Sequence, residues 1–185
     1  SAVSSDGGIT FTLEPGIRVD RGWHGDIDPD NVGAPTTVRL ADGRYRMYYR
    51  AGDEDDRWMN RLKSVILSAI SGDGLNFTPE EGIRIDPRDW IDPMAPDNIS
   101  YLDGPDAVLM DDGVLKLYFW GVSICSGVCL SETGDGLTFD TVEQVFPNER
   151  TPFQVNAGDP SIVPVDDGMW LMYFGNGIGE DQGIW

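Results

Sequence analysis

Carboxylates and tryptophans gather in the segments that separate the apolar stretches of this chain. The most acidic of these segments are 20–34, 51–63, 87–104 and 175–183. Four tryptophans lie in or beside the segments, namely Trp23, Trp58, Trp90 and Trp120. Carboxylates accept hydrogen bonds from hydroxyl groups and can exchange protons, while indole rings stack on the apolar faces of a ligand. This combination suits a sugar, which offers both hydroxyl groups and C–H faces.

The net charge limits the partners further. The chain carries 32 Asp and Glu against 13 Lys and Arg, a formal charge of −19. Binding of nucleic acid needs clustered basic residues, so this class of partner is excluded. Anionic polymers and sialic acids would be repelled by the same field, whereas neutral or cationic ligands are favoured. An equally weighted interpretation is that the acidity only keeps the protein soluble.

Metal and cysteine chemistry is weakly indicated. The acidic runs at 26–31 and 53–56 offer oxygen ligands for calcium, but neither has the EF-hand spacing, and we expect no required cofactor. Cys125 and Cys129 could form a disulfide across a tight turn or remain free thiols. With two Cys and a single His, a zinc site is not expected.

The compartment is not determined by the sequence. No run of about 18 apolar residues is present, so we expect no membrane span. No signal peptide is visible, but the chain starts at Ser1 without a Met, so a segment could have been removed. Secretion or a periplasmic location fits these observations.

Two blocks recur along the chain. Segment 1–20 returns at 68–86 and, more weakly, at 130–146. A second block recurs at 38–49, 108–119 and 163–174, with an Asp-Gly pair and, six residues after the Asp, a tyrosine. Recurrence at this period indicates a supersecondary unit that buries its core by stacking on its neighbours.

Each repeat is predicted to be four short antiparallel strands, because Asp-Gly turns between apolar alternations are hairpin signals. The expected strands are 34–40, 44–51, 63–71 and 76–85, then 104–110, 114–121, 127–133 and 137–146, then 159–165, 169–175 and 182–185. Such units are the blades of a β-propeller. We therefore expect one all-β propeller domain over 1–185, with blades at about 34–86, 104–146 and 159–185, the last completed by 1–20.

A propeller would bring the acidic segments to one face. The first strand of each blade lies innermost, and the loops 20–34, 51–63, 87–104, 121–127, 147–159 and 175–183 open on the face that holds the central pocket. The residues expected to bind substrate there are Trp23, His24, Asp26, Trp58, Trp90 and Asp103. As a lone histidine, His24 is more often a loop hydrogen bonder.

The ends of the repeat suggest how a ring could close. In the second repeat, the positions that follow the equivalent of Trp185 have a sequence like the one that begins at Ser1. Segment 1–20 would therefore supply the strands that the last blade lacks. Three blades are too few for a ring. Two explanations remain open: the chain is a piece of a longer propeller, or two copies exchange ends to form a six-bladed homodimer.

The 159–174 pattern, Asp-Pro-Ser-Ile-Val followed by Asp-Asp-Gly and Met-Tyr-Phe, resembles the propeller glycosidases. These are the arabinanase, β-xylosidase, invertase and levansucrase superfamily, including glycoside hydrolase family 43. The resemblance implies five blades and a central pocket with inner-strand carboxylates. It also implies an Asp acting as base or nucleophile, a second Asp that tunes the pKa, and a Glu that protonates the leaving oxygen.

This resemblance transfers only partly to the chain. Asp159 stands at the position of an inner-strand Asp, whereas Ala34 occupies the corresponding place in the first repeat. The candidate catalytic residues are Asp159, Asp106, which lies one residue past the matching proline, and Glu180 as general acid, with Glu149 as a second choice. Some relatives hold a cation near the pocket, where His24 could help.

A second resemblance concerns the turns alone. Residues 4–11 are similar to the Asp-box of sialidases and related six-bladed propellers, which folds a hairpin and carries no catalysis. The arginine cluster that sialidases use for their anionic sugar is missing from the acidic loops. The resulting hypothesis is a glycosidase-like propeller that hydrolyses or binds a neutral saccharide. The alternative is a non-catalytic carbohydrate-binding or assembly propeller, which Ala34 favours.

Overall fold

The computed structural model describes residues 1–23, 31–52, 64–90, 101–122, 124–147, 157–165, 168–176 and 183–184. Over these residues the regular secondary structure consists almost wholly of strands in antiparallel β-sheets. One 3₁₀-helix, η3 (Pro87–Trp90), follows the first complete sheet. The predicted all-β class is confirmed.

The strands form a hairpin and three larger sheets. The N-terminal hairpin pairs β1 (Ala2–Val3) with β2 (Thr12–Leu13). Sheet I contains β3 (Asn31–Arg39), β4 (Tyr45–Gly52), β5 (Val65–Ser71) and β6 (Phe77–Pro79). Sheet II contains β7 (Tyr101–Leu109), β8 (Leu115–Val122), β9 (Gly127–Thr133) and β10 (Glu143–Pro147). Sheet III contains β11 (Ala157–Pro164), β12 (Trp170–Asn176) and β13 (Gly183–Ile184).

Each sheet is a simple meander, in which consecutive strands are neighbours. The predicted strands are found in each repeat, but two features differ from expectation. The first strands begin earlier than predicted, at Asn31, Tyr101 and Ala157, because pairing continues past an irregularity at the proline. The fourth strands are shorter, and in sheet I only an isolated bridge between Ile66 and Ile85 continues the pairing beyond β6.

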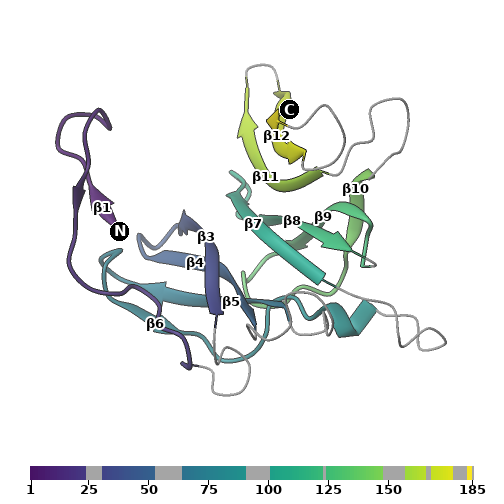
Figure 1. The fold of residues 1–185 in the computed structure, drawn as a ribbon, viewed down its shortest axis with the longest axis horizontal. Coiled ribbons are helices and arrows are strands. Elements are labelled where there is room, and N and C mark those ends of the chain that lie inside the picture. Colours follow the sequence, from purple (N-terminus) through teal and green to yellow (C-terminus); the bar gives the residue numbers. More distant parts are fainter. Residues whose placement is uncertain are drawn as a thin grey trace.

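The three sheets follow one another in a row (Figure 1). Their first strands are adjacent, since β7 packs between β3 and β11. The N-terminal hairpin, in purple, and sheet III, in yellow-green, lie at opposite ends of the row. The sheets therefore stack face to face with their first strands together, as the repeat pattern predicts.

Three apolar clusters pack against the faces of the sheets. The largest joins sheets I and II and includes Tyr48, Ile66, Leu117 and Phe119, all with no exposed surface. A second cluster covers the other face of sheet I, around Tyr49 and Leu67, and Val19 packs against it. A third, around Val128, Ala157 and Phe174, joins sheets II and III. Alternate residues of a strand thus point into different layers.

The same set of hydrogen bonds stabilises the outer hairpin turns of sheet I, of sheet II and of the N-terminal hairpin. In sheet I, the Ser71 hydroxyl donates to Asp73 Oδ1 at 2.9 Å, and that oxygen accepts the N–H groups of Leu75 and Asn76, both at 2.8 Å. Thr133 and Asp135 do the same in sheet II, and Ser4 and Asp6 in the N-terminal hairpin. A side chain that satisfies its own turn backbone fixes the turn locally.

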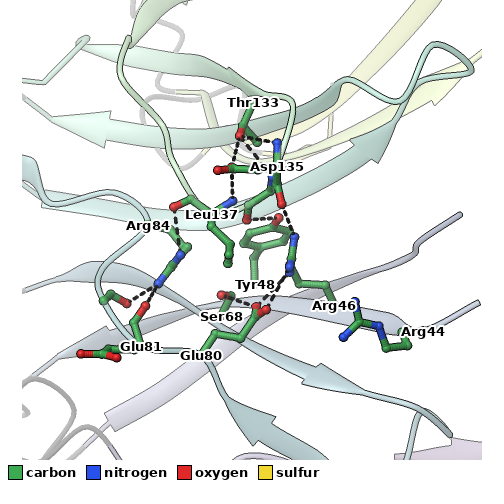
Figure 2. Close-up of polar contacts among 12 residues, drawn as sticks. Arg44, Arg46, Tyr48, Ser68, Glu80, Glu81, Arg84, Thr133, Asp135 and Leu137 are labelled. Atoms are coloured by element: carbon green, nitrogen blue, oxygen red, sulfur yellow. Dashed lines mark hydrogen bonds and ion pairs between the residues drawn. The ribbon is translucent and has the colours of Figure 1, made fainter. Parts of the chain in front are cut away.

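The junction between sheets I and II is closed by hydrogen bonds to that turn (Figure 2). Arg46 Nη1 donates to the Asp135 carbonyl at 2.9 Å, the Tyr48 hydroxyl to the Gly136 carbonyl at 2.8 Å, and Arg84 Nη1 to the Leu137 carbonyl at 2.9 Å. Three donors of one sheet thus bind three consecutive carbonyls of the next. Burial without these partners would be costly, so the contacts set how the sheets dock.

A buried ion pair orients the first of these donors. Arg46 donates from Nε and Nη2 to the two carboxylate oxygens of Glu80, both at 2.9 Å, and the Ser68 hydroxyl donates to the same carboxylate at 2.8 Å. The side chain of Arg46 is 8% exposed and that of Glu80 14%. Two-point contact of this kind fixes the guanidinium plane.

The cysteines, left open by the sequence, are joined. Cys125 and Cys129 form a disulfide with a Cα–Cα separation of 5.9 Å. It closes the connection between β8 and β9, where the Gln144 side chain also donates to the Ser126 carbonyl at 3.0 Å. This short connection is therefore held at two points.

We expect Arg46→Met to lower the free energy of unfolding by about 3–5 kcal/mol, because Glu80 would remain buried without its partner. Arg44→Met is the matched control, because its ion pair with Asp42 is half exposed on both sides and is screened by solvent, so the loss of stability should be much smaller. Urea unfolding followed by circular dichroism measures both. Equal losses in the two variants would contradict a structural role for the junction.

Candidate functional site

The entries of the three first strands share an unusual backbone. Ala34, Gly104 and Asp159 each precede a proline and have positive φ values of 47°, 54° and 47°. The pairing register shifts at the same place in each sheet, between Gly33 and Thr36 in the first. This conformation is rarely populated by residues other than glycine, and especially before proline. An irregularity of this type turns a side chain out of the regular alternation of the strand.

Asp159 is the carboxylate carried by this backbone position. The backbone at Asp159 lies close to the backbone at Gly104 in sheet II. A Cβ added to Gly104 would lie 2.7 Å from the Asp159 Cα. Although much of the Asp159 side chain is accessible to solvent, the surrounding protein raises its pKa, and the charge of Asp103 adds to this, while Arg50 opposes it. No hydrogen bond joins this carboxylate to another described residue.

Asp103 is held by its neighbours. Its Oδ1 lies 3.2 Å from Arg50 Nε and accepts the Gly104 N–H at 2.8 Å, and its Oδ2 accepts the Tyr101 hydroxyl at 2.6 Å. Arg50 in turn donates to Asn31 Oδ1 at 3.0 Å. Burial, followed by the bond to Asp103, raises the pKa of Tyr101 to about 12, so this hydroxyl stays a donor at neutral pH. Asp103 is thus oriented beside Asp159.

Asp106 connects the three first strands. Its Oδ2 accepts the Ile162 N–H of β11 at 2.6 Å, and its Oδ1 accepts the Thr36 hydroxyl of β3 at 3.3 Å. The same Thr36 oxygen accepts the Ala107 N–H at 3.2 Å. Burial raises the pKa of Asp106 although these bonds oppose the change. Both oxygens are engaged within the protein, so the geometry supports a linking role.

The predicted aromatic residues are spread apart. Trp23 lies in the turn after the N-terminal segment and is 39% exposed. Trp90 ends η3 and packs against the cluster between sheets I and II. Trp120 lies opposite Asp103 in the β7–β8 register and makes an edge contact with Tyr101, with ring centroids 5.6 Å apart. Trp120 and Tyr101 are therefore the aromatic residues that border the Asp103 group.

Several sequence-predicted residues lie outside the described part of the chain. They are His24, Asp26, Trp58, Glu149 and Glu180, together with 26–30 of the acidic run 26–31 and the whole run 53–56, both proposed for calcium. Among the residues that are described, no group of three His, Cys, Asp or Glu is placed to hold a metal ion. Within the same residues, no helix is long and apolar enough to cross a membrane.

Sequence reasoning missed Arg50 and Tyr101. Arg50 lies two residues after Tyr48, where sheet II has Trp120 and sheet III has Gly175. A basic residue at this position of an otherwise acidic region was the available signal. Its importance depends on contact with Asp103, which is 53 positions away and comes from a different sheet.

Solved structures of glycoside hydrolases match this architecture. No family model matches the chain, and no curated protein matches it. A family 117 glycoside hydrolase, Zg3597 from Zobellia galactanivorans, is 20% identical with a TM-score of 0.60, over 88% of this chain and 52% of its own. A thermostable family-43 glycoside hydrolase is 14% identical with a TM-score of 0.58, over 78% and 49%.

A putative glycoside hydrolase from Bacteroides ovatus is 17% identical with a TM-score of 0.57, over 80% of this chain and 45% of its own. Over about half of their length, the chain shares the arrangement of antiparallel sheets of these glycoside hydrolase structures. The resemblance expected from the repeat motifs is confirmed at the level of the fold. The chain spans about a third to a half of the length of the structures it matches.

Replacing Asp103 should change the titration of Asp159. We expect Asp103→Asn to lower the pKa of Asp159, because a neighbouring negative charge is removed, and Arg50→Met to raise it, because a neighbouring positive charge is removed. Carbon-detected NMR titration of the carboxyl groups measures both shifts. Asp140→Asn removes an exposed carboxylate elsewhere and serves as control. Shifts of the opposite sign would contradict the described arrangement.

Removal of the Asp106 carboxylate should destabilise the protein. In Asp106→Ala the Ile162 N–H loses its acceptor, which we expect to cost about 1–3 kcal/mol in the free energy of unfolding. Asp140→Ala, at an exposed position, should change it by about 0.5 kcal/mol or less. Urea unfolding compares the two. If Asp106→Ala were as stable as Asp140→Ala, the strand-linking role would be wrong.

Proposed function

We propose that the first-strand entries form part of the pocket of a glycosidase-like propeller that acts on a neutral saccharide. The single observation that carries this proposal is the state of Asp159. It is the candidate carboxylate at a strained, pre-proline strand entry, and no described residue donates a hydrogen bond to it. Such strain concentrates where a side chain has a functional task.

The three neighbouring aspartates divide the roles. Asp106 is engaged by two adjacent strands, and Asp103 by Arg50, Tyr101 and the Gly104 N–H. Asp159 accepts no hydrogen bond from the described part of the chain, so in this proposal its carboxylate binds a ligand hydroxyl or water. A raised pKa makes its carboxylate a stronger base than an ordinary Asp, which suits removal of a proton from an attacking water.

Hydrolysis of a glycosidic bond needs a second carboxyl group that protonates the leaving oxygen. Glu180 remains our proposal for this acid, on the basis of the sequence. In this scheme Asp159 accepts the proton of the attacking water, and its pKa is kept raised by burial and, after that, by the charge of Asp103. Tyr101 and Trp120 would border the sugar on the Asp103 side.

Electrostatics favours a neutral sugar over an anionic one. The chain carries a formal charge of −19, and Arg50, the cation beside the site, is paired with Asp103. A carboxylated sugar would therefore meet Asp159 and Asp103 without a free cation from the described residues. We accordingly place pentosides, hexosides and fructosides before uronides and sialosides as substrates.

A non-catalytic carbohydrate-binding propeller is the second candidate. Ala34 and Gly104 occupy the strand-entry positions equivalent to Asp159, so two of the three described entries carry no carboxylate there. A protein that kept the blades and lost part of the catalytic set would have this pattern. Binding of sugar without turnover distinguishes this candidate from the enzyme.

Asp159→Asn is the decisive variant. We expect it to lower turnover of the active aryl glycoside about 10²–10⁴-fold, the usual contribution of a general base. The fold should be retained, because a carboxyl group with a raised folded-state pKa stabilises below the unfolded pKa and loses that contribution as pH rises through the folded pKa. At neutral pH the amide is therefore neutral or slightly stabilising.

The assay uses aryl pentosides, hexosides and fructosides, with Asp140→Asn as the charge-matched control. Calorimetric titration with the corresponding free sugars measures binding separately. If wild type and Asp159→Asn were equally inert while sugar binding persisted, the non-catalytic candidate would replace the enzyme. If neither turnover nor binding were found, the saccharide proposal itself would fail.

A further inference from the structure

The glycine at the entry of β7 is not explained by its backbone conformation. Gly104 has a φ of 54°, while Ala34 and Asp159, at the same position of β3 and β11, both have a φ of 47°. Positive φ usually favours glycine because glycine has no Cβ. Here two of the three copies carry a Cβ in the same conformation. The backbone conformation alone therefore does not require glycine at position 104.

The space beside Gly104 is occupied by Asp159. A Cβ added to Gly104 would lie 2.7 Å from the Asp159 Cα and 3.2 Å from its Cγ, and it would overlap Oδ1 of the same carboxylate. Real Cβ atoms essentially never approach another heavy atom more closely than 3.0 Å. Since the Asp159 Cα belongs to the backbone, rotation of a side chain could not relieve this overlap. Glycine allows the two strand entries to come this close.

Gly104 also holds the carboxylate that precedes it in the chain. Its N–H donates to Asp103 Oδ1 at 2.8 Å, and Arg50 Nε lies 3.2 Å from the same oxygen. The Tyr101 hydroxyl donates to the other oxygen, Oδ2, at 2.6 Å. The N–H of Gly104 thus orients Asp103, while its missing Cβ leaves room for Asp159. The spacing between the two carboxylates depends on this one residue.

This spacing has an electrostatic consequence. Burial raises the pKa of Asp159, the charge of Asp103 raises it further, and Arg50 opposes both. The interaction between two charges weakens as their separation grows, and water weakens it more. A shift of the β11 entry away from Gly104 would therefore reduce the influence of Asp103 and admit more water to the Asp159 carboxylate.

We propose that Gly104 is a positioning residue of the candidate site: because it has no side chain, the backbone of β11 can place the Asp159 carboxylate beside Asp103. This inference rests on the proposed function, since it gives Gly104 a part in the reaction of Asp159. Gly104 transfers no proton and acts through the position of Asp159. Reacting groups need to be held within about 0.5 Å of their productive geometry, so a displaced strand entry matters.

Gly104→Ala tests this role. The added methyl group pushes the entry of β11 away, and a misplacement of about 1 Å can lower a rate about 10²-fold. We expect kcat for the active aryl glycoside to fall about 10–100-fold. Because the loss concerns the reacting geometry, kcat/KM should fall by the same factor and KM should stay unchanged.

Gly113→Ala is the matched control. Gly113 lies in the turn between β7 and β8, has a φ of 89°, and has open space where a Cβ would be added. The variant therefore carries the cost of alanine at positive φ without displacing a neighbour. We expect it to keep the wild-type kcat. Circular dichroism and urea unfolding establish the folded fraction of both variants.

A carboxyl titration by NMR separates position from turnover. In Gly104→Ala we expect the pKa of Asp159 to be lower than in the wild type, because its carboxylate lies farther from Asp103 and in more water. In Gly113→Ala it should be unchanged. A merely structural role for Gly104 would reduce activity in proportion to the folded fraction and would leave the pKa of Asp159 in the folded protein at its wild-type value.

The wild-type protein offers a measurement that needs no variant. One Hα of Gly104 points in the direction of the missing Cβ, toward Asp159. A strong nuclear Overhauser effect between this proton and the Hα or Hβ protons of Asp159 is therefore expected. This measurement decides the placement of Asp159 if Gly104→Ala does not fold.

The outcomes distinguish this proposal from the function on which it rests. If the wild type hydrolysed no aryl glycoside, the proposed function would fail, whereas the Overhauser effect and a lowered pKa of Asp159 in Gly104→Ala would still support the placement of Asp159 by Gly104. For an active enzyme, an unchanged kcat or an unchanged pKa of Asp159 in folded Gly104→Ala would overturn the positioning role. Absence of the Overhauser effect would overturn it in either case.

Discussion

The docking of sheet I on sheet II depends on buried donors that bond to backbone carbonyls across the junction. Arg46, Tyr48 and Arg84 of sheet I reach the turn at 135–137 of sheet II, and Glu80 keeps Arg46 in place. Because a buried guanidinium or hydroxyl is costly without acceptors, the sheets can dock well in only one position. This constraint places β3 beside β7, and Asp106 links these strands to β11, which carries Asp159.

The three first-strand entries share one irregular backbone conformation. A left-handed residue before proline breaks the regular alternation at the same place in three strands. Such a residue costs about 1–3 kcal/mol when it is not glycine, so Asp159 and Ala34 are retained against a conformational preference. Of the nearby aspartates, Asp103 and Asp106 accept hydrogen bonds from protein groups, whereas Asp159 accepts none from the residues that the structure describes.

Much of the architecture was predictable because it depends on local sequence signals that recur along the chain. Asp-Gly turns, alternating strands and Ser-x-Asp turns depend on residues that are close in the sequence. The sheets are found at the positions where these signals occur. The upstream extension of the first strands was missed, because pairing resumes beyond the irregularity at Gly33 and Thr36. The length of the fourth strands was overestimated. In sheet I, regular pairing ends at Pro79, and 80–85 is joined to β5 by separate backbone bonds to Ser68 and Ile66 rather than by a continuous ladder.

By itself the sequence determined the repeat, the all-β class, the acidity that disfavours anionic partners, and Asp159 as the odd residue among the strand entries. Only the tertiary structure decided that Asp103 is engaged by Arg50, that Asp106 links three strands, and that Cys125 and Cys129 are joined. The reason is physical: hairpins and turns form between near neighbours, whereas the environment of a carboxylate is set by groups brought together when separate sheets dock.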